Sequence, residues 1–158
     1  VLKEIIKVFP NSTLYLVGSK GTIEDDFLKN KANELNVLNN VFFCKADSNI
    51  PYLLNDSSVC LFTSLMEGFG ISLIETQAMG VKCYSSDSVT KITNCGGVEY
   101  IPLSDGPELW AKKIIADYVN GKCLKKYYDC SRFSQKRIMH IYKDLYGGKN
   151  ENRSYNFS

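Results

Sequence analysis

The sequence predicts an α/β fold in which helices cover both faces of a largely parallel sheet. Short apolar runs of strand length alternate along the chain with segments of helical spacing. Most of these runs are apolar throughout, as in strands that a parallel sheet buries on both faces. The 158 residues, with 44% hydrophobic and 23% charged residues, fit a single soluble globular domain.

The first part of the chain contains three strand-like runs, each beside a helical segment. A first helix ends before Pro10, and its apolar face is Leu2, Ile5, Ile6 and Phe9. Beyond it we expect a strand at 14–18, a helix at 22–35, a strand at 41–44, a short helix at 51–55 and a strand at 59–62. Strands connected through helices in this way should run parallel.

The alternation continues through the middle of the chain. Ile71, Ile74 and Ala78 form the expected buried face of a helix. Gly80 closes this helix, because glycine adopts the left-handed conformation that ends many helices. Two further strands are expected at 82–84 and 98–101.

Two more helices are expected near the end of the chain. Asp105 and Glu108 form a capping-box pattern, with Pro107 tolerated in the first turn. The apolar stripe of this helix is Leu109, Trp110, Ile114 and Tyr118, and that of the last helix is Ile138, Ile141, Tyr142 and Leu145. We expect residues 1–146 to form the domain and 147–158 a polar, flexible tail.

Several classes of protein do not fit this composition. The net charge of only +2 does not indicate a nucleic-acid-binding protein, which usually has a strongly basic surface. No apolar run approaches the ~20 residues that cross a bilayer, and the N-terminus lacks the layout of a secretion signal. The six cysteines include no Cys-x-x-Cys pair, which favours reduced thiols in a reducing compartment. The single histidine, His140, has no obvious co-ligands, so no metal site is predicted.

The loop after the strand at 59–62 is the strongest candidate for a functional site, because ligands bind beyond the carboxyl ends of parallel strands. Gly68 and Gly70 let the backbone approach a ligand where a helix begins, and the unpaired N–H groups there suit a diphosphate. Glu67 stands at the mouth of this loop, and Glu75 lies one turn inside the helix, where ribose hydroxyls could donate to it. The same residues also fit a tight turn with two solvated carboxylates, and their spacing alone does not separate these interpretations.

The segment from Ser64 to Gly80 resembles the signature of glycosyltransferase family 4, whose members have two Rossmann-like domains. The hallmark of that signature is a pair of glutamates separated by seven residues, which Glu67 and Glu75 match. The resemblance extends to 14–18 and 49–54 and covers residues 2–146. Within the family, the amino-acid sequence at 87–90 and 101–103 is similar to that of bacterial capsular or exopolysaccharide transferases.

The resemblance implies that the chain is the C-terminal, donor-binding half of a GT-B fold. Such a domain binds a nucleotide-sugar, here a UDP-hexose or UDP-HexNAc, and the sugar passes to a glycan or lipid-linked acceptor with retention at the anomeric carbon. Carried over, Glu67 is the catalytic residue that holds the donor sugar, and Glu75 binds the ribose. The residues implied to contact the sugar and diphosphate are Gly68, Phe69, Gly70, Ile71 and Ser72, and those near the base are Cys44 and Lys45. The nucleotide-sugar is a substrate, and the resemblance implies neither a metal nor a cofactor.

Parts of the family pattern are absent from the sequence. Lys45 stands where the family usually has glycine. In the family, an Arg and a Lys on a strand upstream of the first helix clamp the diphosphate, and the chain begins after that point. That strand is expected to be central in the sheet, and the acceptor-binding domain is missing too. We therefore expect the chain to be inactive alone and to act in the cytoplasm, or at the inner membrane face, as part of a longer protein.

Two other functions fit the same fold class. A catalytically incompetent fragment could bind only a nucleotide or a partner chain. A dinucleotide-dependent oxidoreductase would need a Gly-x-Gly-x-x-Gly turn with an acid about twenty residues further on, which the turn at Gly18 does not supply. The oxidoreductase is therefore disfavoured, and the non-catalytic fragment stays as the alternative.

Overall fold

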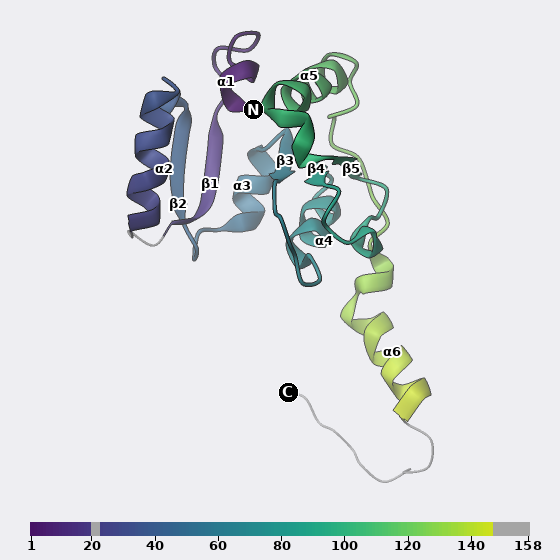
Figure 1. Ribbon diagram of the computed structural model, residues 1–158. Helices are drawn as coiled ribbons and strands as arrows, with labels where there is room; N and C mark the ends of the chain where they lie inside the picture. Colours follow the sequence, from purple (N-terminus) through teal and green to yellow (C-terminus); the bar gives the residue numbers. More distant parts are fainter. Residues whose placement is uncertain (20–22, 147–158) are drawn as a thin grey trace. The chain divides into compact units, whose positions relative to one another are not determined.

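The computed structural model of the chain describes residues 1–19 and 23–146 (Figure 1). The chain divides into two compact units, of which the first is Val1–Tyr128 and the second begins at Asp129. The predicted tail at 147–158 and Thr22, at the start of the second predicted helix, lie outside the described residues. The first unit carries the candidate site.

The described residues form five strands, which confirm the predicted ones. β1 (Leu14–Ser19) pairs in parallel with β2 (Val41–Lys45). β4 (Lys82–Ser86) lies between β3 (Val59–Phe62) and β5 (Val98–Ile101), and both of these pairings are parallel. The strands therefore belong to two sheets rather than one. Within the described part of the chain, all strands but β4 have one edge that pairs with no other strand, β1 and β3 among them.

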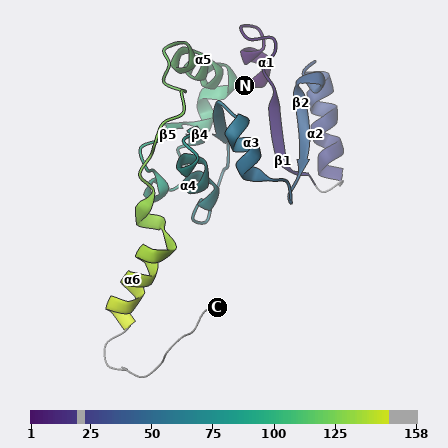
Figure 2. The same cartoon turned by 180° about the vertical axis from the view of Figure 1, so that it is seen from behind.

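Helices cover both faces of the three-stranded sheet (Figures 1 and 2). On one face, α1 (Leu2–Ile5) and α5 (Gly106–Val119) pack together, and on the other lies α4 (Ile71–Ala78). The first face buries Tyr84, Ile101, Trp110, Ile114 and Cys123. The second buries Leu73, Cys83, Val89 and Val98. Because the adjacent residues Cys83 and Tyr84 lie in different clusters, β4 is buried on both faces, as predicted for a parallel strand.

The two-stranded sheet is covered less completely. α2 (Ile23–Glu34) runs alongside β2 (Figure 1), and the ammonium of Lys29 lies 5.9 Å from the ring centroid of Phe43. Tyr15 and Phe42 pair ring to ring, with centroids 5.5 Å apart. Val17 and Phe42 are nevertheless 47% and 49% exposed. These two strands are therefore only half-buried, although their apolar runs predict buried ones.

Two of the shorter helices differ in how their ends form. α1 ends at Ile5 rather than at Phe9, and the residues beyond it form a turn in which the N–H groups of Val8 and Phe9 both donate to the carbonyl of Ile5. α3 (Ile50–Asp56) confirms the predicted short helix, and the side chain of Asn49 caps it by accepting the N–H of Tyr52 at 3.1 Å.

The start of α5 confirms one prediction and contradicts another. Pro107 lies in the first turn, as predicted, but the carboxylate of Asp105 makes no capping hydrogen bond. Asp105 has φ −69° and ψ −13°, which is already helical, whereas a capping side chain needs an extended backbone. The predicted stripe is also only half right, because Leu109 and Tyr118 are exposed. The residues that α5 buries are Trp110, Ala111, Ile114 and Asp117.

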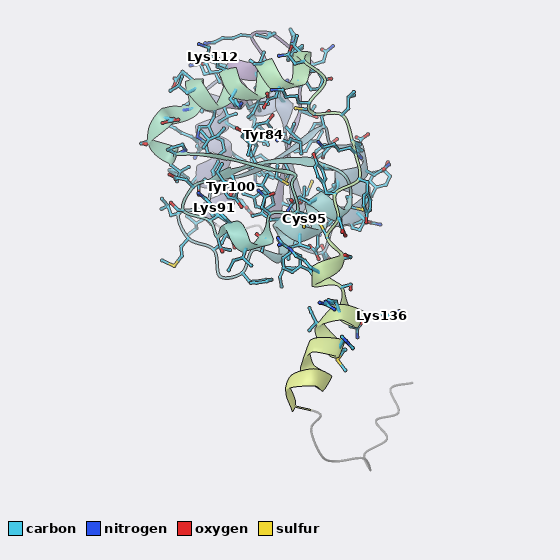
Figure 3. The ribbon with its side chains drawn as sticks, turned by 90° about the vertical axis from the view of Figure 1, so that its right-hand side faces the viewer. Tyr84, Lys91, Cys95, Tyr100, Lys112 and Lys136 are labelled. Carbon is cyan, nitrogen blue, oxygen red and sulfur yellow. The ribbon has the colours of Figure 1, made fainter. Side chains whose placement is uncertain are left out.

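A network of ion pairs lies where α5 ends beside β4, whose Tyr84 is labelled in Figure 3. Asp117 accepts the hydroxyl of Tyr84 at 3.1 Å and lies 3.2 Å from the ammonium of Lys122 and 3.8 Å from that of Lys113. Burial raises the pKa of the Asp117 carboxyl, but the hydrogen bonds from Lys122 and Tyr84 and the nearby ammonium charges outweigh it. Its pKa therefore lies below the usual value.

The second unit contains α6 (Gln135–Tyr146), on which Lys136 is labelled in Figure 3. The N–H of Arg137 donates to the hydroxyl of Ser134 at 3.3 Å, which caps this helix. The predicted last helix is therefore confirmed up to Tyr146. Among the helices that the structure describes, none is both long and apolar enough to cross a membrane.

All six cysteines are free thiols. Cys83 and Cys123 are buried, whereas Cys44 and Cys60 are half-buried.

Candidate functional site

The predicted site loop lies between β3 and α4, at the carboxyl end of β3 (Figure 1). β4 ends at the same edge, because Phe62 of β3 pairs in parallel with Ser85. The hydroxyl of Ser86, the last residue of β4, donates to the carbonyl of Ser64 at 2.5 Å. The start of the loop is therefore fixed to the central strand of the three-stranded sheet.

The N-terminus of α4 has the geometry expected of an anion site. Gly70 is the N-cap residue of α4 and precedes its first helical residue. It has φ +77° and ψ +45°, a left-handed conformation that glycine adopts without strain. No side chain caps this end of the helix. Ile71 and Ser72, the first two residues of the helix, are exposed. The first-turn N–H groups and the positive end of the helix dipole are thus presented at the carboxyl edge of the sheet.

Glu67 is exposed in the loop and is held by a neighbour. The hydroxyl of Ser64 donates to its carboxylate at 3.0 Å. Phe69, two residues further on, is 49% exposed. Gly68 has open space around it, with no atom within 4 Å of where a Cβ would lie, so the fold itself does not require glycine there.

Glu75 is exposed on the outer face of α4, and the rotation of this helix differs from the prediction. The structure buries Leu73, Thr76 and Gln77. Ile71 is 63% exposed and Ala78 is also exposed, so the predicted buried face of Ile71, Ile74 and Ala78 is wrong. The helix has apolar residues on more than one side. The buried side also carries Thr76 and Gln77, whose polar groups form hydrogen bonds inside the protein. Because Ile71 and Glu75 are one turn apart, they share the exposed face.

Cys44 and Lys45 lie at the end of β2, in the other sheet. Cys44 is half-buried and Lys45 is exposed, paired in the ladder with Ser19 after an irregularity in β1. The structure therefore gathers Glu67, Gly68 to Ser72 and Glu75 on one loop and helix, and carries the two predicted base-binding residues on a separate pair of strands.

The charges on this loop and helix limit the chemistry that they can perform. Between Thr63 and Ala78 the chain has no lysine or arginine. A bound diphosphate would therefore meet backbone N–H groups there, and its cationic partners would have to come from elsewhere. Within the described residues, no group of three or more His, Cys, Asp and Glu side chains is arranged to hold a metal ion.

A cavity of about 450 Å³ lies at the opposite end of β3. It is lined by residues that precede this strand, including Asp56 and Ser58, and by Tyr118 and Lys125. It is therefore separate from the candidate site at the carboxyl end.

Sequence reasoning misses the residues that support the site. Ser64 and Ser86 hold the loop through hydrogen bonds. The side chain of Thr93, from the segment after β4, lies beside Gly70, because its hydroxyl oxygen would be 3.6 Å from a Cβ on that residue. Small polar residues far apart in the chain give no periodic signal, so only the fold brings them together.

Comparisons with known proteins agree with this architecture. The sequence profile of the family described as glycosyl transferases group 1 matches residues 1–93, more than half of the chain. The putative glycosyltransferase EpsF of Bacillus subtilis (strain 168) is 33% identical over 89 residues, which are 55% of this chain and 23% of EpsF. The apo form of the lipopolysaccharide outer core galactosyltransferase WaaB superposes with a TM-score of 0.63 at 17% identity, over 92% of this chain and 44% of WaaB. The likeness to WaaB shows the fold, and the chain spans less than half the length of either protein.

Proposed function

Because the chain belongs to the group 1 glycosyl transferases, we propose that it binds the nucleotide-sugar donor of a retaining glycosyltransferase. The family match confirms the resemblance drawn from the segment Ser64 to Gly80. The proposed donor is a UDP-hexose or UDP-HexNAc, and the proposed acceptor is a glycan or a lipid-linked sugar in polysaccharide biosynthesis. One relative is named a putative glycosyltransferase and the other a galactosyltransferase of the lipopolysaccharide outer core, which supports sugar transfer to a glycan.

The observation that carries this proposal is the uncapped N-terminus of α4, with Glu67 just before it and Glu75 on its exposed face. An uncapped helix end at the carboxyl edge of a parallel sheet favours a phosphate group. A carboxylate on either side favours the hydroxyl-rich parts of the same ligand, because carboxylate oxygens accept hydrogen bonds from sugar hydroxyls.

Each part of the site then has a role. Glu67 holds the hydroxyls of the donor sugar beside the anomeric carbon, and Glu75 accepts from the ribose. The bond from the anomeric carbon to the diphosphate breaks with its electron pair on the diphosphate oxygen. The acceptor oxygen bonds to the same face of the sugar, and its proton passes to that diphosphate oxygen. Backbone N–H groups from Phe69 to Ser72 stabilise the charge that develops on the leaving group. Cys44 and Lys45 lie near the base.

Cations for the diphosphate belong to a further strand in this proposal. The unpaired edges of β1 and β3 support a position for one more parallel strand between the two sheets. A strand there, with an Arg and a Lys at its carboxyl end, would supply the charge that the segment Thr63–Ala78 lacks. The acceptor would bind mainly to a second domain of the whole protein.

The test uses the full-length protein that contains this chain. A panel of sugar nucleotides identifies the donor by turnover, and NMR assigns the anomer of the product. UDP binding is then measured by calorimetry in the wild type and in Glu75→Ala, which we expect to weaken binding about tenfold, as for the loss of a hydrogen bond to a charged group. Glu34→Ala, which removes an exposed carboxylate paired with Lys31 on α2, is the matched control and should leave binding unchanged.

Full-strength UDP binding by Glu75→Ala would contradict the assigned site. UDP binding without turnover of any donor would instead favour the alternative, a nucleotide-binding protein without catalysis.

A further inference from the structure

Gln77, in the last turn of α4, is fully buried and uses all four hydrogen-bonding positions of its amide. Its Nε2 donates to the carbonyls of Leu73 and Thr93, each at 2.9 Å. Its Oε1 accepts from the N–H groups of Cys95 at 2.7 Å and Gly97 at 3.1 Å. One of these bonds stays inside α4, and the other three reach the segment after β4. The amide therefore ties α4 to a loop that comes from the neighbouring strand.

This segment, residues 93–97, is called the post-β4 loop here, and Figure 3 labels Cys95 within it. It also supports the start of α4. Thr93 is 0% exposed, and its hydroxyl oxygen lies 3.6 Å from the position of a Cβ on Gly70. Thr93 thus accepts from Gln77 through its carbonyl, and its side chain lies beside Gly70, within van der Waals distance of where a Cβ on that glycine would be. A single loop residue links the last turn of α4 with the residue at which the helix begins.

The post-β4 loop cannot easily move in either direction. A Cβ on Gly97 would lie 2.9 Å from Cγ of Gln77 and 3.0 Å from ring atoms of Tyr128, so the loop already approaches both side chains closely. Movement away would leave the N–H groups of Cys95 and Gly97 without their acceptor, the side-chain Oε1 of Gln77. A buried donor without a partner costs free energy of folding. The loop and α4 are therefore held as one body.

We propose that Gln77 is a positioning residue of the donor site. Through the post-β4 loop and Thr93, it fixes Gly70 and so the direction of the first-turn N–H groups of α4. This inference rests on the proposed function, in which those N–H groups meet the diphosphate. Such groups act by being aimed in advance at the charge of the leaving group, and small misplacements reduce their effect strongly.

Two substitutions break the link at different points. Gln77→Met keeps the length of the side chain but removes its amide. Thr93→Ala keeps the carbonyl that Gln77 binds but removes the hydroxyl and methyl groups that lie beside Gly70. In the full-length protein, we expect each to lower kcat about tenfold and to weaken UDP binding. Because the two residues act in series, the double variant should lose about as much as one single variant, not the product of both.

Ile114→Val is the matched control, since Ile114 is buried in α5 on the other face of the sheet. It should lower Tm while kcat and UDP affinity stay at the wild-type level. The same pattern in Thr93→Ala, a lower Tm with unchanged kcat and UDP affinity, would overturn the proposal, and this variant decides even if Gln77→Met does not fold.

The double variant supplies an independent decision. A loss equal to the product of the two single losses would overturn the proposal, because the residues would then act separately. Failure of the proposed function has a different signature: the wild-type protein would not bind UDP, which overturns both ideas. Failure of this inference alone leaves wild-type UDP binding intact.

Discussion

The hydroxyl of Ser64 donates a hydrogen bond to the carboxylate of Glu67 at 3.0 Å, within a loop that has no regular structure. The carbonyl of the same serine accepts from Ser86 at the end of β4. Glu67 is therefore connected through one residue to the most deeply buried strand. The proposed role of Glu67 needs such a connection, because a carboxylate that holds the donor sugar acts only from a fixed position beside the reacting carbon.

We expect Ser64→Ala to lower kcat about tenfold, since the carboxylate of Glu67 then samples other positions. The KM for the donor should change less, because the proposed site assigns most donor contacts to other residues. Ser64→Thr keeps the hydroxyl and should retain most activity, and Ser88→Ala, at an exposed serine after β4, serves as the control. Steady-state kinetics of the full-length protein check this prediction. Equal activity of Ser64→Ala and the wild type would show that the hydrogen bond does not position Glu67.

The Asp117 network should make stability depend on pH. Because the pKa of Asp117 is lower in the folded protein than its usual value, its stabilising effect is complete above pH ~4, the usual range of an unfolded aspartate. The effect should be lost as the pH falls from there through the lowered pKa. Asp117→Asn should cost about 2 kcal/mol at pH 7, since it removes a buried carboxylate that Lys122 and Tyr84 hydrogen-bond.

Urea unfolding of the wild type and of Asp117→Asn at several pH values checks this prediction. The difference in free energy of unfolding should be constant from about pH 5 to 7 and shrink in more acidic buffer, as linkage requires for a carboxyl with a lowered pKa. A difference that is the same at all pH values would contradict the assigned pKa direction.

Two left-handed glycines should respond differently to alanine. Gly70 and Gly80 have nearly equal φ values, +77° and +76°. A Cβ on Gly70 would meet nothing closer than 3.5 Å, whereas a Cβ on Gly80 would lie 2.9 Å from the backbone oxygen of Lys126. We expect Gly70→Ala to cost about 1 kcal/mol from backbone strain alone and Gly80→Ala about 3 kcal/mol, by urea unfolding. Similar costs for the two variants would show that the backbone near Lys126 moves freely.

The two sheets should differ in protection from hydrogen exchange. Cys83 and Tyr84 of β4 are 0% exposed, while β1 and β2 include residues that are nearly half exposed, such as Val17 and Phe42. β1 and β2 therefore bury less apolar surface than β4, and less free energy is needed to open their hydrogen bonds. Backbone amides of β1 and β2 should therefore exchange faster than those of β4, because the local opening that exposes them costs less free energy. Mass spectrometry of peptides from the two regions tests this, and uniform protection would contradict it.

Local signals in the sequence predict most elements of the fold. Alternating apolar runs predict all five described strands, and Gly80 is correctly predicted to end α4: its N–H bonds the carbonyl of Gln77, and that of Val81 bonds the carbonyl of Thr76. The segment Ser64 to Gly80 also predicts the family that the comparisons confirm. Such features depend on neighbouring residues, so a single chain is enough to read them.

Features that depend on distant residues escape prediction. The rotation of α4 depends on Gln77, whose partners Thr93, Cys95 and Gly97 come from another loop. The apolar pattern alone points to the face of Ile71 instead, because it cannot register a buried amide that is fully hydrogen-bonded. The division into two sheets is missed for a similar reason: each strand is recognisable by itself, but the pairing of β1 with β2 and not β3 is a property of the assembled chain.

Because the strands form two sheets, the part of the chain that forms one sheet can be exchanged without rebuilding the other. Cys44 and Lys45 lie at the end of β2 in one sheet, and Glu67 and Glu75 come after β3 in the other. In the described residues no strand pairing joins the two sheets. Within the described residues, a change in one sheet therefore reaches the other through side-chain packing and the connecting segment that contains α3, not through strand pairing. In the proposed site, where Cys44 and Lys45 lie near the base, residues 14–45 should be exchangeable as a block with those of a relative that prefers another base, and the exchange should change the nucleotide preference without changing the sugar that is transferred.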